Sequence, residues 1–263
     1  MIVIGERING MFKDMKAAIP AQDKATVQDL ARRQLAAGAR VLDVNVGPTS
    51  DDPVSAMKWL VETIREVTDC PLAIDSTKAD AIRAGIGLAG PNSMLNSSPG
   101  DEAKLDLYMP LAAEFGCDII ALTIDEKGIP RDANGRMEIA MRIVERAMLN
   151  GVDLERIYID PVIIPCNVPD AGHHPGEVLE TIRQVKLISD PPPKTTLGLS
   201  NVSQGTSERH LINRTYLVMC LAAGLDSAIV DPLDTELMNA VTTAELLMNQ
   251  SVYCDDFLRA NRP

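Results

Sequence analysis

The chain has 263 residues, of which 46% are hydrophobic, and its formal net charge at pH 7 is −12. This length can bury a large core as one α/β domain or as two smaller ones, and because no linker rich in proline, glycine or serine divides it, we expect one domain over residues 1–263. The acidic balance argues against nucleic acid or an anionic membrane surface as a partner.

The start of the chain, from Met1 to Arg7, has neither a basic flank nor a long apolar run, so we expect no signal peptide, no membrane-spanning helix and a cytoplasmic location. His173 and His174 are adjacent in a stretch bounded by glycine and proline, and we expect a surface loop there. The cysteines are odd in number and widely spaced, which predicts free thiols. They are Cys70, Cys117, Cys166, Cys220 and Cys254.

Short apolar runs alternate with amphipathic segments along the chain. The apolar runs, each of which predicts a strand, are residues 2–4, 41–46, 71–74, 93–95, 118–123, 156–159, 196–204 and 227–230. The amphipathic segments, each of which predicts a helix, are close to residues 27–35, 57–64, 78–88, 102–115, 137–149, 176–189, 213–223 and 235–248.

Eight strand–helix units, over a length close to the ~250 residues typical of the fold, predict an α/β protein that forms a single (β/α)8 TIM barrel. No G-x-G-x-x-G sequence opens a helix, which removes the main reason to expect an open dinucleotide-binding sheet. A sequence cannot show that the eighth strand pairs with the first, so closure of the barrel rests on the count of units alone.

In such a barrel, functional residues gather where the strands end and the next loops begin. The polar residues at these positions are nearly all aspartate or asparagine. They are Glu6, Asn9, Asp43, Asn45, Asp75, Asn96, Thr123, Asp125, Asp160, Ser200, Asn201 and Asp231. Each one alone is explained by strand termination or helix capping. Their convergence on one mouth favours a binding site.

Asp75 and Asp160 are candidates for binding a ligand that presents parallel N–H donors, such as the aminopyrimidinone edge of a pterin, because a carboxylate offers two acceptor oxygens in one plane. Asn96 would add both a donor and an acceptor. The alternative is that these carboxylates bind Mg²⁺ or Ca²⁺ through oxygen. We expect no metal site, since no cluster of cysteine, histidine or glutamate on strands accompanies them.

The stretch 196–204 begins as an apolar run and finishes with uncharged polar residues. Gly198 lets a flat ligand approach the backbone, while Ser200, Asn201 and Gln204 donate and accept hydrogen bonds, which favours recognition of a heterocycle. The alternative is a strand that ends in an ordinary Ser-Asn turn.

Five segments resemble those of the pterin-binding barrel family, which includes dihydropteroate synthase and the folate domain of cobalamin-dependent methionine synthase. They are residues 4–9, 42–47, 74–76, 158–161 and 198–204. Over essentially its whole length the chain looks like the methyltetrahydrofolate:corrinoid/iron-sulfur protein methyltransferases of the anaerobic acetyl-CoA pathway. Residues 211–214 and 249–255 support this narrower resemblance.

The resemblance implies roles for individual residues. Asn201 matches the family's asparagine that hydrogen-bonds the pterin N5, which bears the methyl group, and is the implied catalytic residue. The residues that the resemblance assigns to folate binding are Asp75, Asn96, Asp160, Gly198, Ser200, Asn201, Gln204 and, toward the p-aminobenzoyl-glutamate end, Arg209.

The implied reaction moves the N5 methyl group of methyltetrahydrofolate to cobalt(I) of a corrinoid supplied by a separate corrinoid/iron-sulfur protein. It implies no tightly bound cofactor, a homodimer, and N5 activated by protonation from solvent and by hydrogen bonding. One alternative is a dihydropteroate synthase-like condensing enzyme, against which the seventh and eighth strands offer no cation for pyrophosphate. Another is a non-catalytic folate-binding module of a larger corrinoid methyltransferase, against which no D-x-H-x-x-G corrinoid-binding segment is present.

Overall fold

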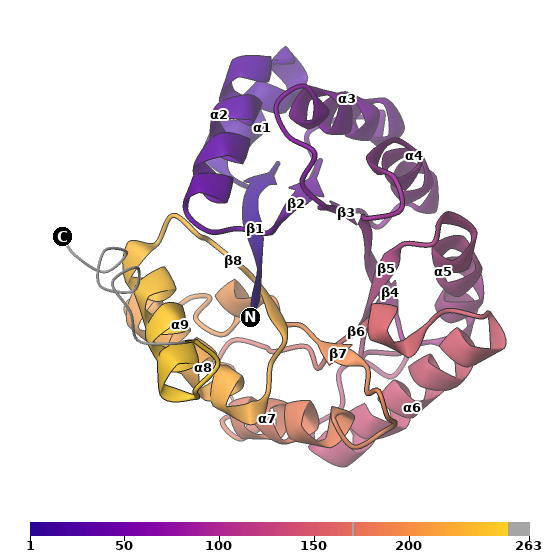
Figure 1. Ribbon diagram of the computed structural model, residues 1–263, viewed down its shortest axis with the longest axis vertical. Helices are drawn as coiled ribbons and strands as arrows, with labels where there is room; N and C mark the ends of the chain where they lie inside the picture. Colours follow the sequence, from indigo (N-terminus) through magenta and orange to yellow (C-terminus); the bar gives the residue numbers. More distant parts are fainter. Residues whose placement is uncertain (170, 252–263) are drawn as a thin grey trace.

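The computed structural model describes residues 1–169 and 171–251, in which eight parallel strands surround a central lumen and helices encircle the strands (Figure 1). Cys254 and the end of the segment 249–255 lie outside the described residues, as does the last part of the predicted domain 1–263. The strands are β1 (Ile2–Asn9), β2 (Val41–Asn45), β3 (Leu72–Asp75), β4 (Met94–Pro99), β5 (Asp118–Leu122), β6 (Ile157–Asp160), β7 (Lys194–Thr195) and β8 (Ser227–Val230).

Amphipathic helices cover the outside of the sheet. They are α1 (Lys13–Ala21), α2 (Lys24–Ala36), α3 (Pro53–Arg65), α4 (Ala79–Ala89), α5 (Glu102–Phe115), α6 (Ala133–Leu149), α7 (His174–Val185), α8 (Arg209–Ala223) and α9 (Thr235–Leu247), with short 3-10 turns η1 (Leu154–Arg156) and η2 (Leu199–Asn201). In this part of the chain no helix combines the length and the apolar character needed to cross a membrane.

The sheet closes into a barrel. Strands that follow one another in the sequence pair in parallel from β1 to β7, and β8 pairs with β1. The last seam is narrow: Gly198 bridges to Ile229, whose N–H donates to the Leu197 carbonyl at 2.9 Å. The prediction of a single (β/α)8 barrel is therefore confirmed, and its eighth strand pairs with its first.

Two apolar layers hold the barrel together. The larger layer lies between the strands and the helices, and it includes residues such as Leu42, Leu60 and Ile82 with no solvent exposure. The smaller layer fills the lumen, because alternate residues of a strand face opposite sides of the sheet. Its members are Ile4, Val41, Ala73, Met94, Ile120 and Tyr158.

Three local predictions differ from the structure. The region after β1 holds two helices, because the chain turns at Gln22, in the left-handed region, and Asp23 caps α2 by accepting from Thr26 N. The strand predicted at 196–204 is misplaced: β7 ends at Thr195, just before it, and Leu199–Asn201 form η2, where local hydrogen bonds satisfy the backbone. His174 is buried beside Arg136 and is not in a surface loop.

Candidate functional site

The polar residues of the mouth come from a simple repeat in the strands. Each lies two residues beyond a member of the small apolar cluster in the lumen, so its side chain also points inward, one level closer to the carboxyl ends of the strands. The pairs are Ile4 and Glu6, Val41 and Asp43, Ala73 and Asp75, Met94 and Asn96, and Tyr158 and Asp160. The barrel therefore concentrates carboxyl and amide groups above an apolar floor.

Neighbouring strands connect these groups by hydrogen bonds. Asn96 Nδ2 donates to Asp43 Oδ1 at 2.8 Å, and Asn45 Nδ2 donates to Asp75 Oδ2 at 2.6 Å. The strand register places Asn45, Asp75 and Asn96 side by side. Asp75 and Asn96 were predicted to act together, and the structure brings them to adjacent positions.

Asp160 is held by its own backbone turn. Its side chain is buried, and Oδ1 accepts from the Val162 N–H at 2.7 Å. The backbone of Gly198 also lowers the pKa of this carboxyl by hydrogen bonding. Gly198 and Asp160, which the sequence placed on different strands, therefore meet at the mouth.

Burial makes these carboxyl groups unusually weak acids. Desolvation raises the pKa of Asp75 to about 6 and that of Asp160 to about 6, although hydrogen bonds to each carboxylate oppose the rise. Desolvation raises the pKa of Asp43 far above its ordinary value, and the nearby charge of Asp75 adds to the effect. A ligand that donates hydrogen bonds to these groups would favour their ionised form.

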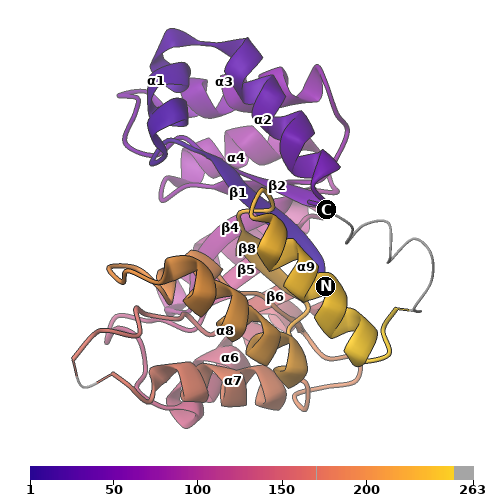
Figure 2. The same ribbon diagram turned by 90° about the vertical axis from the view of Figure 1, so that its left-hand side faces the viewer.

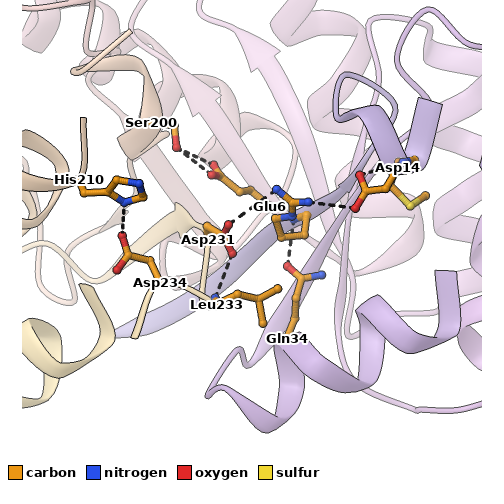
Figure 3. Close-up of polar contacts among 10 residues, drawn as sticks. Glu6, Asp14, Gln34, Ser200, His210, Asp231, Leu233 and Asp234 are labelled. Carbon is orange, nitrogen blue, oxygen red and sulfur yellow. Dashed lines mark hydrogen bonds and ion pairs between the residues drawn. The ribbon is translucent and has the colours of Figure 1, made fainter. Parts of the chain in front are cut away.

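Glu6 lies on the other side of the mouth. Its carboxylate accepts from Ser200 Oγ at 2.8 Å, and this hydrogen bond connects β1 to η2 (Figure 3). Burial raises the pKa of Glu6 to about 7, the Ser200 hydrogen bond opposes this rise, and the charge of Asp231 adds to it. Arg209, the first residue of α8, donates to the Ser200 carbonyl at 3.2 Å.

Two cavities open at this end of the barrel. One, of about 280 Å³, is lined by Glu6, Ser200 and Arg209, and also by the exposed His210, which is hydrogen-bonded to Asp234 (Figure 3). The other, of about 440 Å³, is lined by residues that include Asn45, Asp75, Gly47, Ser76 and Met11. Asn96 and Asp160 lie buried in the lumen, while Asn201 and Gln204 are exposed at its rim.

Sequence reasoning placed Glu6, Asp43 and Asn45 at strand ends but gave them no role. For Glu6 and Asp43 the signal is the spacing of two residues from an apolar lumen residue, and for Asn45 it is the pairing with Asp75; both need the strand register to be recognised. Within residues 1–169 and 171–251, no group of three or more histidine, cysteine, aspartate or glutamate side chains is arranged to hold a metal ion. The expectation of a metal-free site stays a prediction.

The fold and the site define a (β/α)8 barrel with a polar, acidic pocket at the carboxyl ends of its strands. A model of the pterin binding enzyme family matches residues 12–231, and the chain belongs to that family.

Two relatives extend this assignment. The chain is 30% identical over 266 aligned residues to methylcorrinoid:tetrahydrofolate methyltransferase of Eubacterium limosum, an alignment that covers 100% of this chain and 96% of the relative. It is 36% identical over 241 residues to methionine synthase of Mycobacterium tuberculosis, and this alignment covers 88% of this chain but only 20% of that protein.

Solved structures show the same fold. A dihydropteroate synthase from Xanthomonas albilineans with 4-aminobenzoic acid has a TM-score of 0.69 and 16% identity, and the match covers 95% of this chain and 93% of that one. A dihydropteroate synthase from Yersinia pestis has a TM-score of 0.68 and 14% identity, with 94% of each chain covered. At these identities the likeness concerns the fold alone.

Proposed function

We propose that the protein transfers a methyl group between N5 of tetrahydrofolate and the cobalt of a corrinoid carried by another protein. The observation that carries this proposal is the alignment with the Eubacterium limosum methyltransferase, which runs over this whole chain and nearly the whole relative. The sequence resemblance suggests transfer from methyltetrahydrofolate to cobalt(I), whereas the relative's name gives the opposite direction. One site can serve both, because a catalyst lowers the same barrier in each direction.

The two directions share one displacement. Toward the corrinoid, the electron pair of cobalt(I) forms the new Co–C bond while the N5–C bond breaks and leaves its electron pair on N5, which retains a proton. Toward the folate, the lone pair of unprotonated N5 attacks the methyl group, and the electron pair of the Co–C bond returns to cobalt. The protein must therefore hold N5 still and stabilise its change of charge.

In this proposal Asp75, Asn96 and Asp160 hold the pterin ring. Asp160 is buried, Asp75 is half-buried, and both have raised pKa values, so pterin N–H donors would supply the hydrogen bonds that stabilise their ionised forms. Asn96 donates to Asp43 with its amide nitrogen, which leaves its amide oxygen free to accept from the ring. Gly198, beside Asp160, lets the ring approach the backbone.

Asn201, Ser200, Gln204 and Arg209 form the rim. The Asn201 side chain makes no hydrogen bond within the part of the chain that the structure describes, so its amide can accept from protonated N5 or donate to unprotonated N5. Ser200 is already bonded to Glu6, which fixes the turn that carries Asn201. Gln204 would line the ring, and Arg209 would approach the p-aminobenzoyl-glutamate end.

We propose a corrinoid/iron-sulfur protein as the partner and the anaerobic acetyl-CoA pathway as the setting, on the strength of the sequence resemblance. The corrinoid then belongs to the partner, and this chain binds no cofactor tightly. We place the protein in the cytoplasm.

We also propose a homodimer formed through the outer face of α8, which lies between α7 and α9 on the outside of the barrel (Figure 2). Leu211, Val218 and Met219 project from one side of α8 and are 52%, 37% and 46% exposed. We expect Met219→Glu to give monomers in light scattering after size-exclusion chromatography, whereas Met148→Glu on α6 does not. A parent protein that is already a monomer would contradict the dimer.

The test of the reaction is a transfer assay with the purified protein. Methyltetrahydrofolate and a reduced corrinoid/iron-sulfur protein are mixed, and the cobalt(I) absorbance is followed as it converts to methylcobalt(III). The reverse mixture, tetrahydrofolate with the methylated corrinoid protein, measures the other direction. Folate binding without transfer in either mixture would indicate a binding module, and formation of dihydropteroate from a pterin pyrophosphate and 4-aminobenzoate would indicate a condensing enzyme.

A further inference from the structure

Arg136 on α6 is the largest side chain that is completely buried in the described residues. Its guanidinium donates from Nε to the Pro161 carbonyl at 2.8 Å and from Nη1 to the Asp132 carbonyl at 3.1 Å. Nη2 lies 2.8 Å from Nδ1 of His174. The arginine thus joins α6 to both ends of the long loop between β6 and α7. This loop begins immediately after Asp160.

His174 acts here as a hydrogen-bond acceptor. Arginine has only donors, so the histidine nitrogen that faces it carries no proton. Burial, and then the charge of Arg136, lower the pKa of His174 to about 4, which keeps the ring neutral. The carboxylate that most favours the charge of Arg136 is Glu177 on α7, whose Oε2 accepts from Ala133 N at 2.8 Å.

The loop that Arg136 holds contains a strained residue. Val162 has a φ of +55°, in the left-handed region that a β-branched residue rarely adopts. The Val162 N–H, which shares a planar peptide with the Pro161 carbonyl, donates to Asp160 Oδ1 at 2.7 Å. Such strain persists only where the surrounding structure fixes the backbone, and the arginine bonded to the preceding carbonyl does so.

We propose that Arg136 is a positioning residue for Asp160: by holding the Pro161 carbonyl it keeps the strained Pro161–Val162 peptide in place, and the Val162 N–H in turn fixes the orientation of the Asp160 carboxylate toward a ligand. The identity of that ligand as a pterin rests on the proposed function. The contacts among Arg136, Pro161, Val162 and Asp160 do not depend on that function.

The experiment compares two arginines of α6. Arg142 also donates to a loop carbonyl, that of Gly100 at 3.0 Å. Because Gly100 is not in the loop that follows Asp160, Arg142→Met is the matched control. We expect Arg136→Met to weaken methyltetrahydrofolate binding at least about tenfold, and Arg142→Met to change it less than about twofold. Adding Val162→Gly to Arg136→Met restores most of the affinity, because glycine adopts a positive φ freely.

A second measurement needs no ligand. In the parent protein, we expect the NMR chemical shift of the Val162 amide to change with pH as Asp160 titrates. In Arg136→Met, we expect this coupling to be lost. If Arg136→Met does not fold, Arg136→Lys, which cannot reach all three acceptors, undergoes the same measurements. An unchanged amide titration in the folded variant overturns the inference, and so does folate affinity equal to that of the parent. A parent that binds no folate but shows the coupled titration overturns the proposed function instead.

Discussion

Asp75 and Asp160 are acids in an environment that opposes their charge. Their raised pKa values mean that the empty site is partly protonated near pH 6, and that a ligand with N–H donors must bind the ionised forms. Folate affinity measured by calorimetry should therefore be greatest well above pH 6 and should fall as the pH drops through that value.

At neutral pH the same residues are tested by isosteric substitution. Asp75→Asn or Asp160→Asn keeps the shape but turns one acceptor oxygen into a donor, so a pterin N–H faces another N–H. We expect each change to weaken folate binding by about 2 kcal/mol in calorimetry at pH 7.5. Asp118→Asn, at the opposite end of the lumen, is the control and should leave the dissociation constant unchanged. A normal constant for Asp160→Asn would place that residue outside the pocket.

Asn201 differs from the two aspartates because it lies exposed on the rim, where the proposed reaction would transfer the methyl group. We expect Asn201→Ala to keep its fold and to lower the single-turnover transfer rate by roughly 10²-fold, more than it lowers folate affinity, because its hydrogen bond matters most while charge develops on N5. Stopped-flow absorbance of cobalt(I) gives the rate, and calorimetry gives the affinity. A rate within about threefold of the parent would leave Asn201 with a structural role only.

At the level of elements, the shortest strand of the barrel lies beside the site. β7 has two residues, and beyond it the contact with β8 continues at the Gly198–Ile229 bridge and the hydrogen bond from Ile229 N to the Leu197 carbonyl. The Ser200–Glu6 hydrogen bond spans the same region from η2 to β1.

Ser200→Ala tests this connection. The serine hydroxyl donates to the charged form of Glu6, so its removal should raise the pKa of Glu6 above about 7, as followed by ¹³C NMR of the carboxyl group. Ser203→Ala removes a hydroxyl of the same segment that donates to the Ser200 carbonyl and has no bond to Glu6, so the pKa of Glu6 should stay as in the parent. A fall in the pKa of Glu6 in Ser200→Ala would contradict the assigned bond.

The eight strands and the helix that completes each unit could be predicted from the sequence because each unit has its own apolar periodicity, but the additional helix α1 was missed. The bounds near residues 196–204 could not, since an apolar run that ends in a 3-10 turn has the same local pattern as a strand. For the site, Asp75 and Asn96 could be grouped from strand ends alone. The roles of Asp43 and of buried Arg136 depend on strand register and on a contact between distant segments, which no local pattern contains.

For the whole molecule, the buried carboxyls predict an unusual dependence of stability on pH. Glu6, Asp43, Asp75 and Asp160 have higher pKa values folded than unfolded, so the folded state binds more protons between about pH 4 and pH 7. Their contribution to stability is complete below the unfolded pKa and is lost as the pH rises through the folded values.

We therefore expect the melting temperature of the ligand-free protein to fall by several degrees from pH 5 to pH 8 in calorimetry. Asp43→Asn should flatten this dependence, because the amide has no proton to lose. His174, whose pKa falls to about 4 on folding, opposes this trend below about pH 6.5, but it is one group against four. Exposed carboxyls with lowered pKa values, such as that of Asp52, titrate below this range and do not reverse the trend. A melting temperature that rises across the range would show that the mouth carboxyls are not buried as described.

The apolar floor of the lumen has a kinetic consequence. Ile4, Ala73 and Tyr158 are nearly or completely inaccessible to solvent, so within the described residues the polar pocket above them opens to solvent at the carboxyl ends of the strands. In the proposed reaction, folate and the corrinoid domain would then share this entrance, with folate first and deepest. We therefore expect a compulsory order of turnover, in which spent folate departs after the larger partner has left and a partner that docks on the empty barrel forms a dead-end complex.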